Sequence, residues 1–169
     1  ENAVMVTLGT GIGGGIVMGG QLHRGANGFA GEIGHMVVQH NGEQCVCGRR
    51  GCWERYASGS ALRMLSGGMS GEEVFAAANS GDSHAQSVVA TFADWVAVGL
   101  ASLTNICDPE VIVIGGGVVQ SFEFVLESVS KSFSAALYSS ESRPHPALHV
   151  AALGERAGAI GCALFMTQG

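Results

Sequence analysis

Two short apolar runs in this chain each end at a cluster of glycines, and this pattern restricts the fold more than any other feature. The first run covers residues 3–8 and is followed by five glycines within residues 9–15. The second covers residues 111–114 and leads directly into three glycines at 115–117. Such runs are typical of strands buried in a sheet, and the second reads as a parallel strand covered on both faces. We therefore expect two buried strands, each followed by a backbone that a ligand can approach closely.

The rest of the chain alternates between strand-like and helical patterns. Further strands are predicted at 16–18 and 21–23 around a turn at 19–20, and also at 33–38 and 148–153. Since strands and helices alternate in the second half, the α/β class is predicted. No linker or repeat interrupts the pattern, so we expect a single domain over residues 1–169.

Several helices are predicted from Trp53 onward. Ser70 and Glu73 have the spacing of a capping box, and Asp82 can cap a long helix that ends before Pro109. A helix at 157–166 is expected to be the last element. The apolar stripe of another helix contains Val118, Phe122, Val125, Val129, Phe133 and Leu137.

Charge and composition exclude several classes of protein. Only 13% of residues are charged, and the net charge is −6 with one lysine, Lys131. This balance argues against a nucleic-acid surface, which needs clustered Lys and Arg. A hydrophobic content of 47% excludes a disordered chain. The most apolar stretch, 88–103, contains Asp94, and no signal-peptide pattern is visible, so we expect no membrane contact, a cytoplasmic location, and large surfaces that another body covers.

The first glycine cluster has two interpretations. The pattern Gly9-x-Gly11-x-x-Gly14 formally matches a dinucleotide fingerprint, but a strand and a turn follow it where that fingerprint needs a helix. Backbone N–H groups in such a loop can instead cradle a phosphate, with Thr10 adding a hydroxyl. The alternative is a turn that needs positive φ angles.

The second glycine cluster, Gly115, Gly116 and Gly117, also has two interpretations. Contact with a ligand at the sheet edge and close packing of a helix on the strand are both open.

Three cysteines and a histidine form the second cluster of interest. Cys45, Cys47 and Cys52 lie within eight residues, and His35 is ten residues upstream. Three thiols and one imidazole are a ligand set for structural zinc. Disulfides are the alternative, but the chain has five cysteines and no secretion signal.

The two remaining cysteines and two carboxylates complete the candidate residues. Cys107 and Cys162 lie in apolar helical runs and are expected to be inert core residues. Glu54 and Glu32 would approach one another if a metal joins Cys52 to His35. Two carboxylates beside an imidazole suit a polyhydroxyl ligand, whereas the simpler readings are a helix-start carboxylate for Glu54 and a surface acid for Glu32.

Three motifs together closely resemble the ROK family, whose name covers repressors, open reading frames and sugar kinases. They are the glycine cluster at 8–15, the segment 28–35 that contains Glu32 and His35, and the segment 45–54 that contains the three cysteines and Glu54. The segment 153–161 is also similar to the end of the family. Trp53 and residues 56–59 are most similar to bacterial glucokinases of this family, particularly the actinobacterial type.

The resemblance implies a fold and a set of ligand contacts. The fold is the two-lobed, actin-like ATPase (ribonuclease H-like) fold, of which this chain would be the C-terminal lobe, with a zinc-binding loop at about 35–52. Glu32, His35 and Glu54 would bind sugar hydroxyls. Thr10 and Gly11 would face the phosphates of ATP, and Gly115, Gly116 and Gly117 the adenosine. Zinc would be held by His35, Cys45, Cys47 and Cys52.

The resemblance also implies what this segment does not supply. Family kinases carry an Asp-x-Gly-Gly-Thr phosphate loop and an aspartate base upstream of the part found here, so we expect no catalytic residue in this chain and no activity from it alone. The chain opens on a strand-like run, as expected of part of a longer protein. The implied enzyme is a glucokinase that transfers the γ-phosphate of Mg²⁺-ATP to the 6-hydroxyl of glucose. It would pair this lobe with an N-terminal lobe and form a homodimer or a higher homo-oligomer.

Two other functions stay open at this point. One is the sugar-sensing half of a ROK repressor, which would bind sugar but not ATP. The other is a zinc-stabilised packing module without a small ligand. The complete glycine cluster favours the kinase, because a sensor has no need of a phosphate cradle.

Overall fold

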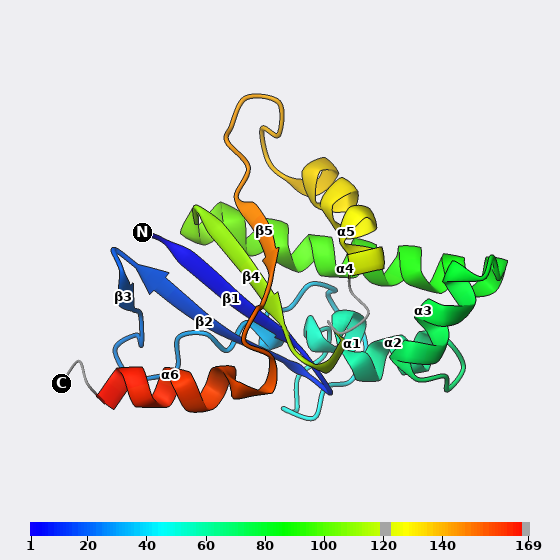
Figure 1. Cartoon of the computed structure of the whole chain (residues 1–169), viewed down its shortest axis with the longest axis horizontal. Coiled ribbons are helices and arrows are strands. Elements are labelled where there is room, and N and C mark those ends of the chain that lie inside the picture. The colour runs from blue at the N-terminus through cyan, green and yellow to red at the C-terminus, as the bar shows by residue number, and fades with distance from the viewer. Residues whose placement is uncertain (119–122, 167–169) are drawn as a thin grey trace.

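A computed structural model describes residues 1–118 and 123–166 of the chain. A five-stranded sheet in the order β3-β2-β1-β4-β5 forms its centre, with helices packed beside it (Figure 1). β1 pairs antiparallel with β2 and parallel with β4, and β5 extends the parallel half. The strands are β1 (Ala3–Leu8), β2 (Ile12–Met18), β3 (Gln21–Leu22), β4 (Val111–Gly115) and β5 (Ala147–Val150).

The central strands pack one face against the main helices. Val4, Val6 and Leu8 of β1 are fully buried, as are Ile112 and Ile114 of the parallel neighbour β4. These side chains belong to one core that also contains the buried faces of α4 and α5. The two buried strands predicted from the sequence are confirmed.

The structure contains helices from residue 54 onward, as predicted, and a helical turn at residues 33–35, where a strand is predicted. They are η1 (Ile33–His35), α1 (Glu54–Ala57), α2 (Gly59–Leu65), α3 (Gly71–Asn79), α4 (Ser83–Cys107), α5 (Glu123–Ala136), η3 (Gly154–Arg156) and α6 (Ala157–Met166). The predicted capping box of α3 is present, because Ser70 and Glu73 bond reciprocally. The side chain of Asp82 caps α4 as predicted, accepting from the Ala85 N–H at 2.7 Å.

The long helix α4 contributes many of the buried residues of the core. By length and composition it could cross a membrane, but 61% of its most apolar window is buried inside the protein. α5 packs across it on the same side of the sheet, while α6 lies apart from this pair (Figure 1). The apolar character of α4 is therefore explained by its central place in the core.

Several predicted boundaries are corrected by the structure. Residues 33–38 are not a strand: residues 33–35 form η1, and Val37 makes an isolated bridge to Cys52. Gly34 is packed against the Ile12 carbonyl, which leaves no room for a side chain at this position. β5 ends at Val150, and β3 ends at Leu22. Phe122, assigned to the stripe of α5, lies outside the described residues.

The loop formed by the first glycine cluster is also shorter than predicted. β2 begins at Ile12, so Gly13, Gly14 and Gly15 belong to a strand and only residues 9–11 form the loop. None of the five glycines has a positive φ, so the interpretation as a positive-φ turn is wrong. Gly14 is needed for another reason: a Cβ there would run into the side chain of Ile33.

Candidate functional site

The four predicted metal ligands come together in one cluster. The ligand atoms of His35, Cys45, Cys47 and Cys52 all lie within 4.8 Å of one another. The Sγ of Cys45 is 3.8 Å from Nδ1 of His35, and the Sγ atoms of Cys47 and Cys52 are 3.6 Å apart. A tetrahedral zinc site with Zn–S bonds of about 2.3 Å separates its ligand atoms by about 3.5 to 3.8 Å. The donor set therefore fits this metal in both chemistry and spacing.

Tight turns bring these ligands together. The Cys45 N–H donates to the Arg49 carbonyl at 2.8 Å, and the Gly48 N–H donates to the Cys45 carbonyl at 3.1 Å. Gly48 has φ +88° and Gly51 has φ +81°, which other residues rarely adopt. A side chain at Gly51 would also collide with the Gln39 carbonyl. The glycines of this segment thus fold the chain back sharply enough to cluster the cysteines.

The thiols have distinct electrostatic environments. Burial raises the pKa of Cys45 to about 12, and burial also raises the pKa of Cys52. A hydrogen bond from the backbone N–H of Arg49 lowers the pKa of the exposed Cys47 thiol. All five cysteines are free thiols, so the disulfide alternative is not what the structure shows.

The other two cysteines differ from each other. Cys107 packs against the core, as predicted. Cys162 on α6 is exposed, so its assignment to the core is wrong. The sequence placed it in an apolar run, but α6 is largely exposed in the part of the chain that the structure describes.

Glu54 lies between the metal ligands and the glycine loop. It is the first residue of α1, and its side chain is 15% exposed. Its Oε1 accepts from the Cys45 thiol at 3.1 Å and is 3.7 Å from Nδ1 of His35. Its Oε2 faces Gly11, where an added Cβ would lie only 2.6 Å from this oxygen. One carboxylate thus contacts both clusters that the sequence singled out.

Glu32 is placed differently from Glu54. It precedes η1, its side chain is exposed, and its carbonyl accepts from the His35 N–H at 3.1 Å. No contact between the carboxylates of Glu32 and Glu54 is recorded among the described residues. The structure brings His35 and Glu54 together, and it leaves Glu32 one turn away with its carboxylate open to a ligand.

A cavity of about 430 Å³ joins the two glycine clusters. Gly9 and Thr10 line one side of it, and Gly117 lines another, although about a hundred residues separate them in the sequence. α2 is fixed to this loop, because the Gly59 N–H donates to the Gly9 carbonyl and the Ser60 hydroxyl to the Thr10 carbonyl, both at 2.7 Å. The remaining lining residues are Gly59, Ser70, Gly71, Glu72, Phe75 and Val118.

The start of α3 in this cavity was missed by sequence reasoning. The sequence analysis names only Ser70 and Glu73 there, and it does not single out Gly71 and Glu72, which line the cavity. The signal that could have found them is the capping box itself, since it marks a helix N-terminus, whose N–H groups favour anions.

The three glycines at the end of β4 and just after it have different surroundings. Gly115 is buried in the strand, and Gly116 has φ +99° and lies against the backbone of Leu8. Close packing thus explains Gly116. Gly117 lines the cavity shared with Thr10. All three glycines also line a second hollow of about 450 Å³, beside Met5 and the start of α6.

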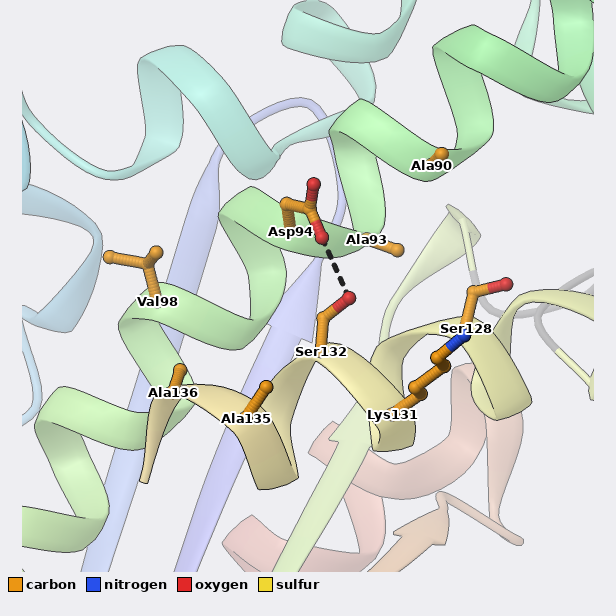
Figure 2. A pocket seen from close by; sticks show the side chains of 9 residues that line it. All are labelled: Ala90, Ala93, Asp94, Val98, Ser128, Lys131, Ser132, Ala135 and Ala136. Carbon is orange, nitrogen blue, oxygen red and sulfur yellow. Dashed lines mark hydrogen bonds between the residues drawn. The ribbon is translucent and has the colours of Figure 1, made fainter. Parts of the chain in front are cut away.

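A further hollow of about 630 Å³ lies between α4 and α5, away from both glycine clusters (Figure 2). Four of its nine lining residues are alanines, and the Ser132 hydroxyl donates to Asp94 at 2.7 Å across the groove. It contains none of the predicted site residues. The candidate functional site therefore consists of the His35–cysteine cluster, Glu54 and the glycine clusters.

Comparison with known proteins places the chain among sugar kinases and repressors. The ROK family model matches residues 1–169. A glucokinase of Streptomyces coelicolor is 35% identical over 96% of this chain and 58% of its own length. A xylose repressor of Bacillus subtilis is 32% identical over 95% of this chain and 43% of its own length.

One solved structure has nearly the same fold. It is a ROK family glucokinase from Streptomyces griseus in complex with glucose and AMPPNP, 38% identical, with a TM-score of 0.93. The match covers 100% of this chain and 61% of that chain. It confirms the predicted α/β, actin-like ATPase fold. The chain spans somewhat more than half the length of the glucokinases that it matches.

Proposed function

The chain belongs to the ROK family, and we propose that it is the C-terminal lobe of an ATP-dependent glucokinase. The whole enzyme would transfer the γ-phosphate of Mg²⁺-ATP to the 6-hydroxyl of glucose. This proposal is supported by the similarity of the chain to the glucokinases of two Streptomyces species, one of them in complex with glucose and AMPPNP. We further propose a cytoplasmic enzyme that forms a homodimer or a higher homo-oligomer.

The position of Glu54 is the observation that carries the proposal. Its Oε1 faces His35 and Cys45, and its Oε2 faces Gly11. A carboxylate accepts hydrogen bonds from sugar hydroxyls, and a glycine loop offers N–H groups to phosphate. A hexose held by Glu54 would therefore lie next to the loop suited to the phosphates. That adjacency is what transfer between the two ligands requires.

Each predicted residue then has a role. Glu32, His35 and Glu54 would hold the sugar, and Thr10 and Gly11 would contact the phosphates. For the adenosine we propose Gly115, Gly116 and Gly117, of which Gly117 is the one that lines the cavity with Thr10. Zinc on His35, Cys45, Cys47 and Cys52 would fix the loop beside Glu54, and we assign it a structural part. His35 can serve both ligands, because Nδ1 faces Cys45 and leaves the second ring nitrogen for a hydroxyl.

The proton acceptor for the sugar hydroxyl is not assigned to this chain. We propose that an aspartate of an N-terminal lobe supplies it, together with a second phosphate loop. Phosphoryl transfer depends on positioning, on Mg²⁺ and on such a residue. This segment alone is therefore expected to bind ligands without turnover.

A sugar-sensing domain of a transcriptional repressor is the second candidate. The similarity to the xylose repressor favours it. A sensor would bind sugar through the same metal-supported site and would have no use for the cavity between Thr10 and Gly117. Nucleotide binding therefore separates the two functions.

The test uses the full-length protein. We expect glucose-dependent ADP release from Mg²⁺-ATP, and calorimetric binding of a non-hydrolysable ATP analogue in the presence of glucose. Sugar binding without any nucleotide binding would replace the kinase with the repressor. No heat from glucose, even with Mg²⁺-ATP present, would leave only the packing module.

Metal content tests the zinc part separately. Elemental analysis should find about one zinc per chain. Cys47→Ser should remove it, whereas Cys162→Ser, which changes an exposed thiol on α6, should retain it. Absence of zinc from the wild-type protein would contradict the assignment.

A further inference from the structure

The loop that carries two of the metal ligands contains no helix or strand. We call residues 39–51 the metal loop. An isolated bridge between Val37 and Cys52 joins the residues that flank the loop, and a second bridge between Gln44 and Arg50 joins its two limbs. Most of its side chains are exposed. The positions of its sulfur atoms therefore depend on the few contacts that fix this loop to the rest of the protein.

Tyr56 makes one such contact from α1. Its hydroxyl oxygen accepts from the backbone N–H of Glu43 at 2.7 Å. The carbonyl of the same Glu43 accepts from the Gly51 N–H at 2.8 Å, one residue before Cys52. Glu43 thus connects the two limbs of the metal loop, and Tyr56 holds Glu43.

The ring of Tyr56 is itself fixed to the core helix α4. Its centroid lies 4.5 Å from that of Trp95. The indole N–H of the fully buried Trp53 donates to the Trp95 carbonyl at 2.7 Å. Because Trp53 and Tyr56 flank Glu54 in the sequence, the same anchorage fixes the start of α1. The hydroxyl of Tyr56 therefore extends from a rigid base.

The metal loop is shaped to receive this hydroxyl. Gly42 lies directly against it, and any side chain there would collide with the Tyr56 oxygen. The Gly42 N–H donates to the Gln39 carbonyl at 3.1 Å, which closes a turn at this point. The backbone of the metal loop thus contacts the Tyr56 hydroxyl at two consecutive residues, Gly42 and Glu43, so the conformation of the loop fits this hydroxyl.

We propose that Tyr56 is a positioning residue for the metal site. Its hydroxyl, by accepting from Glu43, keeps the limb that carries Cys45 and Cys47 against Cys52 and so slows release of the metal. The proposal rests on the zinc site proposed above and adds a residue that does not touch the metal.

The experiment measures zinc release from the full-length protein to a chromogenic chelator. Tyr56→Phe keeps the ring on Trp95 and removes only the hydroxyl, so release should be about five- to tenfold faster, as expected for one lost hydrogen bond. The matched control is Tyr138→Phe, the same change at the chain's other tyrosine, which is 75% exposed. Its release rate should equal that of the wild type.

The outcomes are separable. Unchanged release from Tyr56→Phe, or equal acceleration by Tyr138→Phe, would overturn the role of Tyr56. The unfolding midpoints of the metal-free variants should agree, and a selective fall for Tyr56→Phe would assign the effect to the fold and overturn the proposal. A wild-type protein that binds no zinc would instead contradict the zinc site itself.

Discussion

The thiol of Cys45 donates a hydrogen bond to Oε1 of Glu54, with 3.1 Å between the two atoms. This bond joins Cys45, a candidate metal ligand, to Glu54, a candidate sugar-binding residue. A cysteine bound to zinc is a thiolate and has no proton to donate. Metal binding would therefore leave Oε1 open to accept from a hydroxyl of the sugar.

Glu54→Ala should separate the sugar site from the metal site. In the full-length protein we expect glucose affinity to fall at least about tenfold, because a carboxylate acceptor is lost. Zinc content should stay at about one per chain, since Glu54 is not among the four clustered ligands. Calorimetry and elemental analysis measure the two effects. Glu127→Ala, a change at an exposed carboxylate on α5, serves as control, and unchanged glucose affinity in Glu54→Ala would refute the role of Glu54.

Gly11→Ala should also weaken sugar binding, because the added methyl disturbs the other oxygen of the Glu54 carboxylate. The added methyl would lie 2.6 Å from Oε2 of Glu54, so the carboxylate has to move. We expect about a five- to tenfold loss of glucose affinity with little change in unfolding, because only the end of a flexible side chain shifts. Gly15→Ala, where an added Cβ meets no atom within 4 Å, is the matched control. Equal affinities of the two variants would contradict this prediction.

Gly99→Ala should destabilise the fold itself. Gly99 of α4 lies against the ring of Trp53, and an added Cβ would collide with that ring. Trp53 is fully buried, so it has nowhere to move. Overpacking of this kind costs about 2 to 3 kcal/mol in the free energy of unfolding, measurable with urea. Gly15→Ala should stay near the wild-type value, and a stable Gly99→Ala protein would show that the packing around Trp53 yields.

The capping box of α3 should make stability depend on pH. The backbone N–H of Ser70 donates to the Glu73 carboxylate at 2.7 Å and lowers the pKa of Glu73 from its ordinary value of 4.5. A folded pKa below the unfolded one means stability that is fully present above about pH 4.5 and is lost as pH falls through the folded pKa. Glu73→Ala should therefore lower the urea midpoint at pH 7, and the difference from wild type should shrink in acid.

Glu73→Gln is the informative comparison for that series. Glutamine keeps an acceptor for the Ser70 N–H but cannot titrate. Its midpoint at pH 7 should lie between those of the wild type and Glu73→Ala. A deficit of Glu73→Ala that is the same at every pH would show that the carboxylate charge has no part in the cap.

Local sequence pattern was sufficient for most of the elements. The capping box at Ser70, the cap at Asp82 and the apolar runs of β1 and β4 have the periods and turn residues of their structures, and each was predicted within a few residues. The cluster of His35 with the three cysteines was also predicted, because three thiols and an imidazole at short spacing imply metal-binding chemistry without knowledge of the fold.

The errors have a common physical cause. Residues 33–38 are predicted as a strand, but residues 33–35 form η1, in which Gly34 packs closely against Ile12. Gly13, Gly14 and Gly15 resemble a loop, yet they pair with β1. In both places contacts with residues distant in the sequence outweigh the local preference.

By itself, the sequence determined the α/β class, the helix caps and the residues that could hold a metal. Only the tertiary structure decided that Gly117 shares a cavity with Thr10, that Glu54 faces both Gly11 and Cys45, and that the Tyr56 hydroxyl contacts the metal loop. Hydrogen-bonding capacity and periodicity are local properties of a chain. Which of these groups meet depends on how the sheet and α4 pack, and that packing joins segments tens of residues apart.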